Sequence, residues 1–248
     1  MNTIKQQLND QYNILFTELN IDSKTGIVNN SQQRFASKAC IGENYINAKK
    51  KILFISLDMG KDENYKGNNF QNFDERRVNV CDEDLNNKNP HMAGVYGTAL
   101  YFLQKEYNWE KQWELLKSGN MYFKQAIVLH KNELTKDVLS YISLINMFNF
   151  VTIGRGFDVD KDNKIKGRAG ANDRVFIDVK KELKLLQATI DILKPDVIVV
   201  QSLSLRNYFK QLSLDGIDVF VGFHPSVFGR NIKYRLPNKY IEHLTTKR

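Results

Sequence analysis

Residues 51–61 read KILFISLDMGK, an apolar run that passes directly into a polar turn containing glycine. Residues 52–55 are apolar without alternation, which predicts a central parallel strand covered on both faces. Asp58 follows this strand, and Gly60 allows the chain to turn sharply there. Because ligands of open α/β sheets bind just beyond the carboxyl ends of the strands, Asp58 is a candidate site residue. The alternative is that Asp58 only caps a turn or the next helix.

The composition is ordinary for a globular protein, with 248 residues of which 42% are hydrophobic and 26% charged. This length predicts one α/β domain with an N-terminal helical extension. We assign residues 1–37 to the extension and residues 38–248 to the domain. There is no apolar run of about 18 residues and no secretory signal pattern, so we expect a cytoplasmic protein without a membrane partner. Cys40 and Cys81 are too few for a four-thiolate cluster, and a disulfide between them is not expected.

The charge is unevenly distributed along the chain. The net charge is +8, and residues 151–248 carry +7 of it, with 18 Lys and Arg against 11 Asp and Glu. Such an asymmetry favours a surface that faces a polyanion, of which nucleic acid is the usual example. Many basic proteins bind no DNA, so the charge alone does not identify a partner.

Helical and strand patterns alternate along the rest of the chain, which predicts a three-layer α/β/α fold with a central, mainly parallel four-stranded sheet. An amphipathic helix packed on the core is expected near the N-terminus, and residues 21–50 look irregular. Residues 61–91 are expected to form a long loop whose aromatic side chains could stack on a base. The predicted helices cover residues 1–20, 92–106, 109–118, 176–193 and 202–212, and the predicted strands after the first cover residues 145–153, 196–201 and 217–223.

Residues 158–169 begin like a calcium-binding EF-hand loop, with Asp158, Asp160 and Asp162 at alternate positions. Asn163 stands where that loop needs glycine, and Ala169 stands where it needs a bidentate glutamate. We therefore reject calcium. With too few cysteines for an iron–sulfur cluster as well, we expect no metal or other cofactor.

Polar side chains stand in or after three of the predicted strands: Asp58, Asn146 or Asn149, and His224. If the strands are parallel neighbours, these groups converge on one edge of the sheet. An amide in an apolar strand needs a partner, because burying it unsatisfied costs about 1 to 3 kcal/mol, and that partner is either protein or ligand. An amide can read a base edge, a carboxylate can position water, and a histidine can polarise a carbonyl, so the set suits a nucleobase site.

Over residues 38–246 the chain resembles the uracil-DNA glycosylase superfamily. The family's first motif is met by residues 56–60, SLDMG, and its amide-bearing strand by residues 149–151, NFV, or 146–148, NMF. A basic Asn-x-Arg segment before a long helix corresponds to residues 172–174, NDR, and a buried strand to KPDVIVVQ, residues 194–201. The closing HPS motif is intact at residues 224–226, with Arg230 shortly after it.

The resemblance implies a role for each matching position. Asp58 would orient the attacking water, His224 would hydrogen-bond the leaving base, and Asn149 or Asn146 would read the base edge. The remaining candidates are Phe70 and Met92 for stacking on the base, Gly60 beside it, Phe228 as a wedge in the minor groove, and Ser226, Arg230, Lys233 and Arg174 for contacts to DNA.

The chain departs from the family pattern at three positions. Met59 replaces the proline of the first motif and Ser56 replaces its leading glycine, which puts the turn geometry in question. Gly60 stands where one branch has the tyrosine that excludes thymine, so selectivity for uracil does not follow. The four-cysteine cluster of the iron–sulfur branches is absent.

Three functions fit these observations. The first is a monomeric DNA glycosylase of base excision repair, which flips a uracil-like or damaged base from double- or single-stranded DNA and hydrolyses its N-glycosidic bond. The second is a non-catalytic nucleic-acid- or nucleotide-binding protein of the same fold. The third is a hydrolase of free nucleosides, indifferent to DNA.

Overall fold

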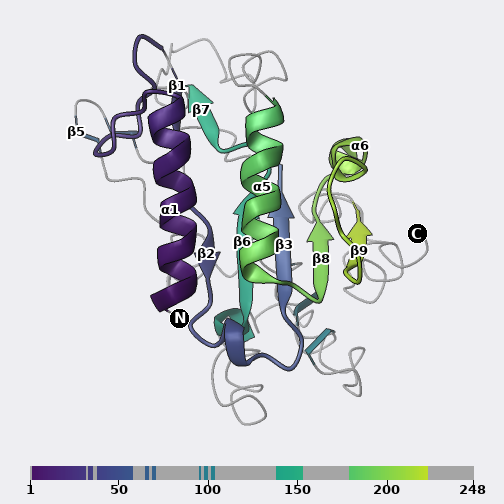
Figure 1. Ribbon diagram of the computed structural model, residues 1–248. Helices are drawn as coiled ribbons and strands as arrows, with labels where there is room; N and C mark the ends of the chain where they lie inside the picture. Colours follow the sequence, from purple (N-terminus) through teal and green to yellow (C-terminus); the bar gives the residue numbers. More distant parts are fainter. Residues whose placement is uncertain are drawn as a thin grey trace, which may run out of the picture.

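The protein has a mixed α/β fold built on a five-stranded, mostly parallel sheet (Figure 1). The computed structural model describes residues 2–31, 33–35, 38–57, 65–66, 69–70, 95, 98–99, 102–103, 138–152 and 179–222. Four strands of the sheet are parallel, and the edge strand β2 is antiparallel to its neighbour β6. In spatial order the strands are β2 (Cys40–Ile41), β6 (Ile142–Asn146), β3 (Ile52–Ser56), β8 (Val197–Val200) and β9 (Asp218–Val221).

The central strand is β3, as the apolar run at residues 52–55 predicts. It pairs in parallel with β6 on one side and with β8 on the other. The four side chains of residues 52–55 are fully buried, because β3 has a strand on each side and packing on both faces. Leu53 and Ile55 belong to the main hydrophobic cluster, so Ile52 and Phe54 point to the opposite face.

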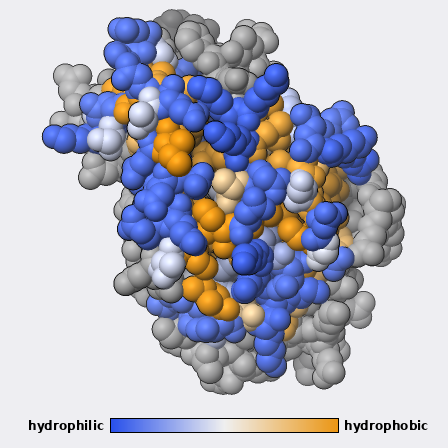
Figure 2. Space-filling model, in the orientation of Figure 1, coloured by the Kyte–Doolittle hydropathy of each residue, from blue (hydrophilic) through white to orange (hydrophobic). Residues whose placement is uncertain are grey.

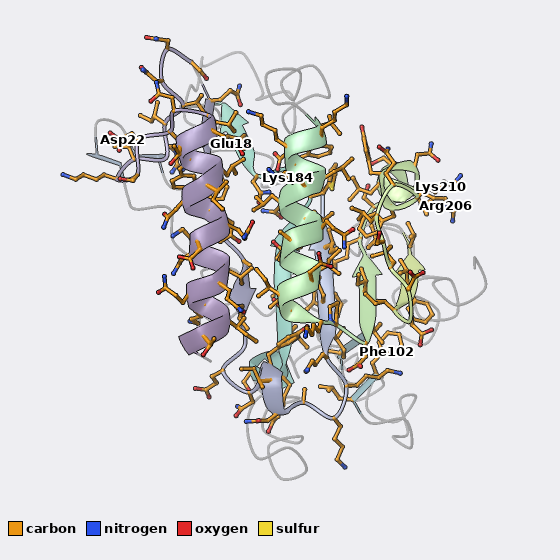
Figure 3. All side chains as sticks on the ribbon, in the orientation of Figure 1. Glu18, Asp22, Phe102, Lys184, Arg206 and Lys210 are labelled. Carbon is orange, nitrogen blue, oxygen red and sulfur yellow. The ribbon has the colours of Figure 1, made fainter. Side chains whose placement is uncertain are left out.

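Two helices, α1 (Asn2–Glu18) and α5 (Val179–Leu193), lie side by side over one face of the sheet (Figure 1). Their buried side chains belong to the same cluster as Leu53 and Ile55, so residues 2–35 and the sheet share one core. Lys184 and Glu18 form an exposed ion pair between the helices at 3.4 Å (Figure 3). On this side hydrophilic side chains cover the helices, and hydrophobic atoms show between them (Figure 2). The helices predicted at residues 1–20 and 176–193 are confirmed over the described residues, with Leu8, Tyr12, Leu15, Phe16, Leu183, Leu186, Ile190 and Leu193 buried.

Helical residues also cover the other face of the sheet. Phe102 packs on Phe220 of β9, with ring centroids 5.1 Å apart. Val219 and Val221 lie against the core under α1 and α5, so Phe220 points away from those helices. The described positions 95, 98, 99, 102 and 103 are all helical, which agrees with the helix predicted at residues 92–106.

The helix α5 ends where the sequence predicts it to end. Lys194 has a φ of 46°, a left-handed residue that closes the helix, and Pro195 follows it. The carboxylate of Asp196 then accepts a hydrogen bond from the backbone N–H of Lys51 at 2.7 Å, which ties the start of β8 to the start of β3. After β8 the predicted helix at residues 202–212 forms as a 3₁₀ turn, η4 (Leu203–Leu205), and a short helix, α6 (Arg206–Phe209).

The prediction that residues 21–50 are irregular is wrong. Strand β1 (Gln33–Phe35) pairs antiparallel with β7 (Phe150–Thr152) in a separate sheet, and β2 adds a fifth strand to the main sheet, where four were predicted. These strands are two or three residues long, too short to show a periodic pattern. The segment also contains the 3₁₀ turn η1 (Tyr45–Asn47).

The strand predicted at residues 145–153 is two strands. A 3₁₀ turn, η2 (Val138–Tyr141), leads into β6, which begins at Ile142, three residues earlier than predicted. Strand β6 ends at Asn146, three residues follow, and the chain enters β7 at Phe150, where it pairs with β1. All residues from 142 to 150 are buried, so the apolar run itself does not mark the boundary.

The loop predicted at residues 61–91 contains a small hairpin of β4 (Tyr65–Lys66) and β5 (Asn69–Phe70). Tyr65 pairs with Phe70 across it. The two residues between the strands, Gly67 and Asn68, are of the kinds that two-residue hairpin loops prefer. That dipeptide is the signal from which the hairpin could have been predicted.

Candidate functional site

Three polar residues end neighbouring strands of the sheet at its carboxyl edge. They are Asn146 on β6, Ser56 on β3 and Gln201 directly after β8, and we call them the polar row. Ser56 is in register with Asn146, and Gln201 follows Val200, the partner of Ile55. Their side chains are only 3%, 2% and 0% exposed, respectively.

The polar row lies on the sheet face opposite α1 and α5. Side chains alternate along a strand, and the preceding residues Ile55, Ile145 and Val200 belong to the cluster under those helices. The hydroxyl of Ser56 donates a hydrogen bond to Oε1 of Gln201 at 2.7 Å. This bond links β3 to β8 within the buried layer.

The polar row also marks the topological switch point of the sheet. From β3 the chain passes to β6 on one side, then crosses to β8 and β9 on the other side. Open α/β sheets bind ligands outside the carboxyl ends of the strands at such a point. The Ser56–Gln201 hydrogen bond joins the two strands between which the order reverses.

Asn149 makes its contacts away from the polar row, with Glu182 of α5. Its backbone N–H donates to Oε1 of Glu182 at 3.0 Å, and its side-chain Nδ2 donates to Oε2 at 2.9 Å. Glu182 is 2% exposed, and this burial raises its pKa to about 7, while the two hydrogen bonds from Asn149 oppose the rise. The amide of Asn149 thus has a protein partner, one of the two alternatives that the sequence leaves open.

The backbone that leads to Asp58 is held by the segment after β6. The N–H of Met147 donates to the carbonyl of Ser56 at 2.8 Å, and the N–H of Phe148 donates to the carbonyl of Leu57 at 2.9 Å. The pairing of these two chain segments therefore continues past the end of β3. Leu57 is the residue directly before Asp58.

Most of the site residues predicted from the sequence lie outside the described residues. Asn146 and Asn149 are described in full, and Phe70 is described only as part of β5. On the other side of the sheet, the N–H of Gly222 donates to the carbonyl of Val200 at 2.9 Å, two residues before His224. The predicted residues outside the described ranges are Asp58, Gly60, Met92, Arg174, His224, Ser226, Phe228, Arg230 and Lys233.

The sequence interpretation did not assign roles to Glu182 and Gln201. Glu182 lies three residues after Val179 and four before Leu186, on the apolar stripe of α5. A carboxyl group on such a stripe is a signal that it has a buried partner. Gln201 closes an apolar strand much as Ser56 does, and this repeated pattern is the signal for the polar row.

Two exposed cationic side chains lie close to the carboxyl edge of the sheet. Arg206 and Lys210 lie on and directly after α6, within ten residues of Gln201, and both side chains are exposed (Figure 3). They are four residues apart and so share one side of the helical turn. This placement adds positive charge beside the strand ends.

Among the described residues, no three His, Cys, Asp or Glu side chains come together in a way that could hold a metal ion. No helix in the described part of the chain is both long and apolar enough to cross a bilayer. No protein-family model matches the chain, and the curated proteins contain no significant match to it either.

Proposed function

We propose that the protein is a DNA glycosylase with a three-layer fold of the uracil-DNA glycosylase type. It flips a uracil-like or damaged base out of DNA and hydrolyses its N-glycosidic bond. The observation that carries the proposal is the polar row at the switch point of the sheet, with Asp58 two residues beyond Ser56. Its location is where an open α/β sheet binds a ligand.

Asn146 is the better of the two asparagines for reading the base. It ends β6 in register with Ser56, on the strand ends that lead to Asp58. Asn149 instead donates from its Nδ2 to Glu182 on the side of α5. In this assignment Oδ1 of Asn146 accepts the N3–H of uracil, and its Nδ2 donates to O4 of the base.

The chemistry is divided between two further residues. Asp58 orients the attacking water and stabilises the positive charge that develops on the sugar. His224 hydrogen-bonds O2 of the leaving base. Arg206 and Lys210 add positive charge for the phosphate backbone, together with Arg230 of the basic C-terminal segment.

The test is release of free base from DNA that contains uracil or one of a panel of deaminated and alkylated bases. Wild type is expected to release at least one of them, and Asp58→Asn should slow this release. Asn146→Asp should abolish release of uracil, because a carboxylate cannot donate to O4. Asn44→Asp is the matched control, since Asn44 hydrogen-bonds Ser140 at the amino end of the sheet.

The outcomes separate the candidate functions. If wild type releases no base from any DNA in the panel, the glycosylase proposal is wrong. Salt-dependent DNA binding without release, unchanged by Asp58→Asn, would favour the non-catalytic binding protein. Release from free nucleosides alone would favour the small-molecule hydrolase.

A further inference from the structure

We infer that Glu182 is a positioning residue: by holding Asn149 it fixes the segment 147–149, and this segment fixes the backbone that presents Asp58. The inference rests on the proposed function, because it assigns Asp58 to the reaction. Glu182 itself touches neither substrate nor water in this scheme. It acts on Asp58 through the segment 147–149.

The first link is the contact between α5 and the segment after β6. Both carboxyl oxygens of Glu182 accept hydrogen bonds from Asn149, one from the backbone and one from the side chain. Two bonds from one carboxyl group fix the position and the orientation of the residue that they hold. Asn149 is therefore attached to the first turn of a long helix packed on the core.

The second link runs from this segment to β3. Asn149 is the last of three residues between β6 and β7. The other two, Met147 and Phe148, donate their backbone N–H groups to the carbonyls of Ser56 and Leu57. Holding Asn149 thus keeps these N–H groups aimed at the carbonyls that precede Asp58.

The consequence concerns the rate of the chemical step. A misplacement of a catalytic group by about 1 Å can cost about 100-fold in rate. Glu182→Gln keeps the size of the side chain, but its Nε2 is a donor and cannot accept from Asn149. One of the two hydrogen bonds is lost, and a loss in kcat of about 10- to 100-fold is expected, with KM little changed.

A double-mutant cycle with Asp58 separates positioning from general stability. Base release is measured under single-turnover conditions, well below the melting temperature, for Glu182→Gln, Asp58→Asn and the double variant. If Glu182 acts through Asp58, the substitution at 182 slows wild type but not the Asp58→Asn protein. Equal fold-losses in both backgrounds would overturn the inference.

Hydrogen exchange tests the structural link without relying on activity. Glu182→Gln should speed amide exchange at Met147, Phe148 and Asn149. The control is Thr189→Val, which removes the buried hydrogen bond from the hydroxyl of Thr189 to the carbonyl of Leu185 in the same helix and should leave these amides unchanged. Unchanged exchange in Glu182→Gln would overturn the inference, whether or not base release is found.

A second variant guards against failure of Glu182→Gln to fold. Asn149→Ala keeps the backbone hydrogen bond to Glu182 and removes only the bond from Nδ2. It should change exchange and kcat in the same direction, because it too removes one of the two hydrogen bonds. Absence of base release in wild type would contradict the proposed function, while the exchange result would still decide whether Glu182 holds the segment.

Discussion

Raising the pH through neutrality is expected to destabilise the protein through Glu182. Burial raises the pKa of this carboxyl group from 4.5 to about 7 in the folded state. Between these values the folded protein keeps a proton that the unfolded chain has lost. The stabilising contribution is therefore complete below about pH 4.5 and is lost as the pH rises through about 7.

The size of the effect follows from the two pKa values. At about 1.4 kcal/mol per pH unit, the interval from 4.5 to about 7 corresponds to about 3 to 4 kcal/mol. Over an accessible range of about pH 5 to about pH 8.5, roughly 2 to 3 kcal/mol of this contribution should be lost. The two hydrogen bonds from Asn149 lower the same pKa that burial raises, so the value of about 7 already contains their effect.

The assay is denaturant unfolding of wild type and Glu182→Gln across this pH range. Subtracting the two free energies of unfolding at each pH removes the contributions of groups that titrate in both proteins. Wild type should lose about 2 to 3 kcal/mol relative to the variant as the pH rises. A difference that stays constant with pH, or one that moves in favour of wild type, would refute the reasoning.

Three further predictions test other parts of the structure. Ser56→Ala removes the donor to the buried Oε1 of Gln201 and should lower the free energy of unfolding by about 1 to 3 kcal/mol in urea titrations; no loss would mean that this oxygen finds another donor. Gly42→Ala places a methyl group against the backbone carbonyl of Ser140 and should lower the free energy of unfolding by about 1 to 3 kcal/mol. Thermal melting would detect this loss, and an unchanged melting temperature would show that the backbone there moves to make room for the methyl group. Arg230→Ala should weaken DNA binding similarly for all sequences and reduce the slope of log affinity against log salt by about one; an unchanged slope would mean that Arg230 contacts no phosphate.

The sequence by itself determined those elements whose apolar residues follow one clear pattern, either a short unbroken run or helical spacing. The apolar run at residues 52–55 predicts a central strand because a strand buried on both faces has no polar side, and β3 is that strand. The apolar positions of α1 and α5 recur at helical spacing, so both helices could be predicted. The end of α5 before Pro195 could also be predicted, because proline cannot continue a helix.

Only the tertiary structure decided where the apolar run predicted at residues 145–153 divides into β6 and β7. Residues 142–150 are buried throughout, first beside β3 and then in the separate sheet with β1. A pattern of apolar residues reports burial and does not report which strand is the neighbour. Strand β6 ends at Asn146, which is in register with Ser56, the last residue of β3.

The polar contacts of the candidate site depended on the fold in the same way. Ser56 and Gln201 are 145 residues apart in the chain, and Asn149 and Glu182 are 33 apart. The sequence indicated that a buried amide near the end of β6 needs a partner, because an unsatisfied one is costly. Strand order and register bring the partners together, and these arise from packing between distant segments, which no local pattern of residues encodes.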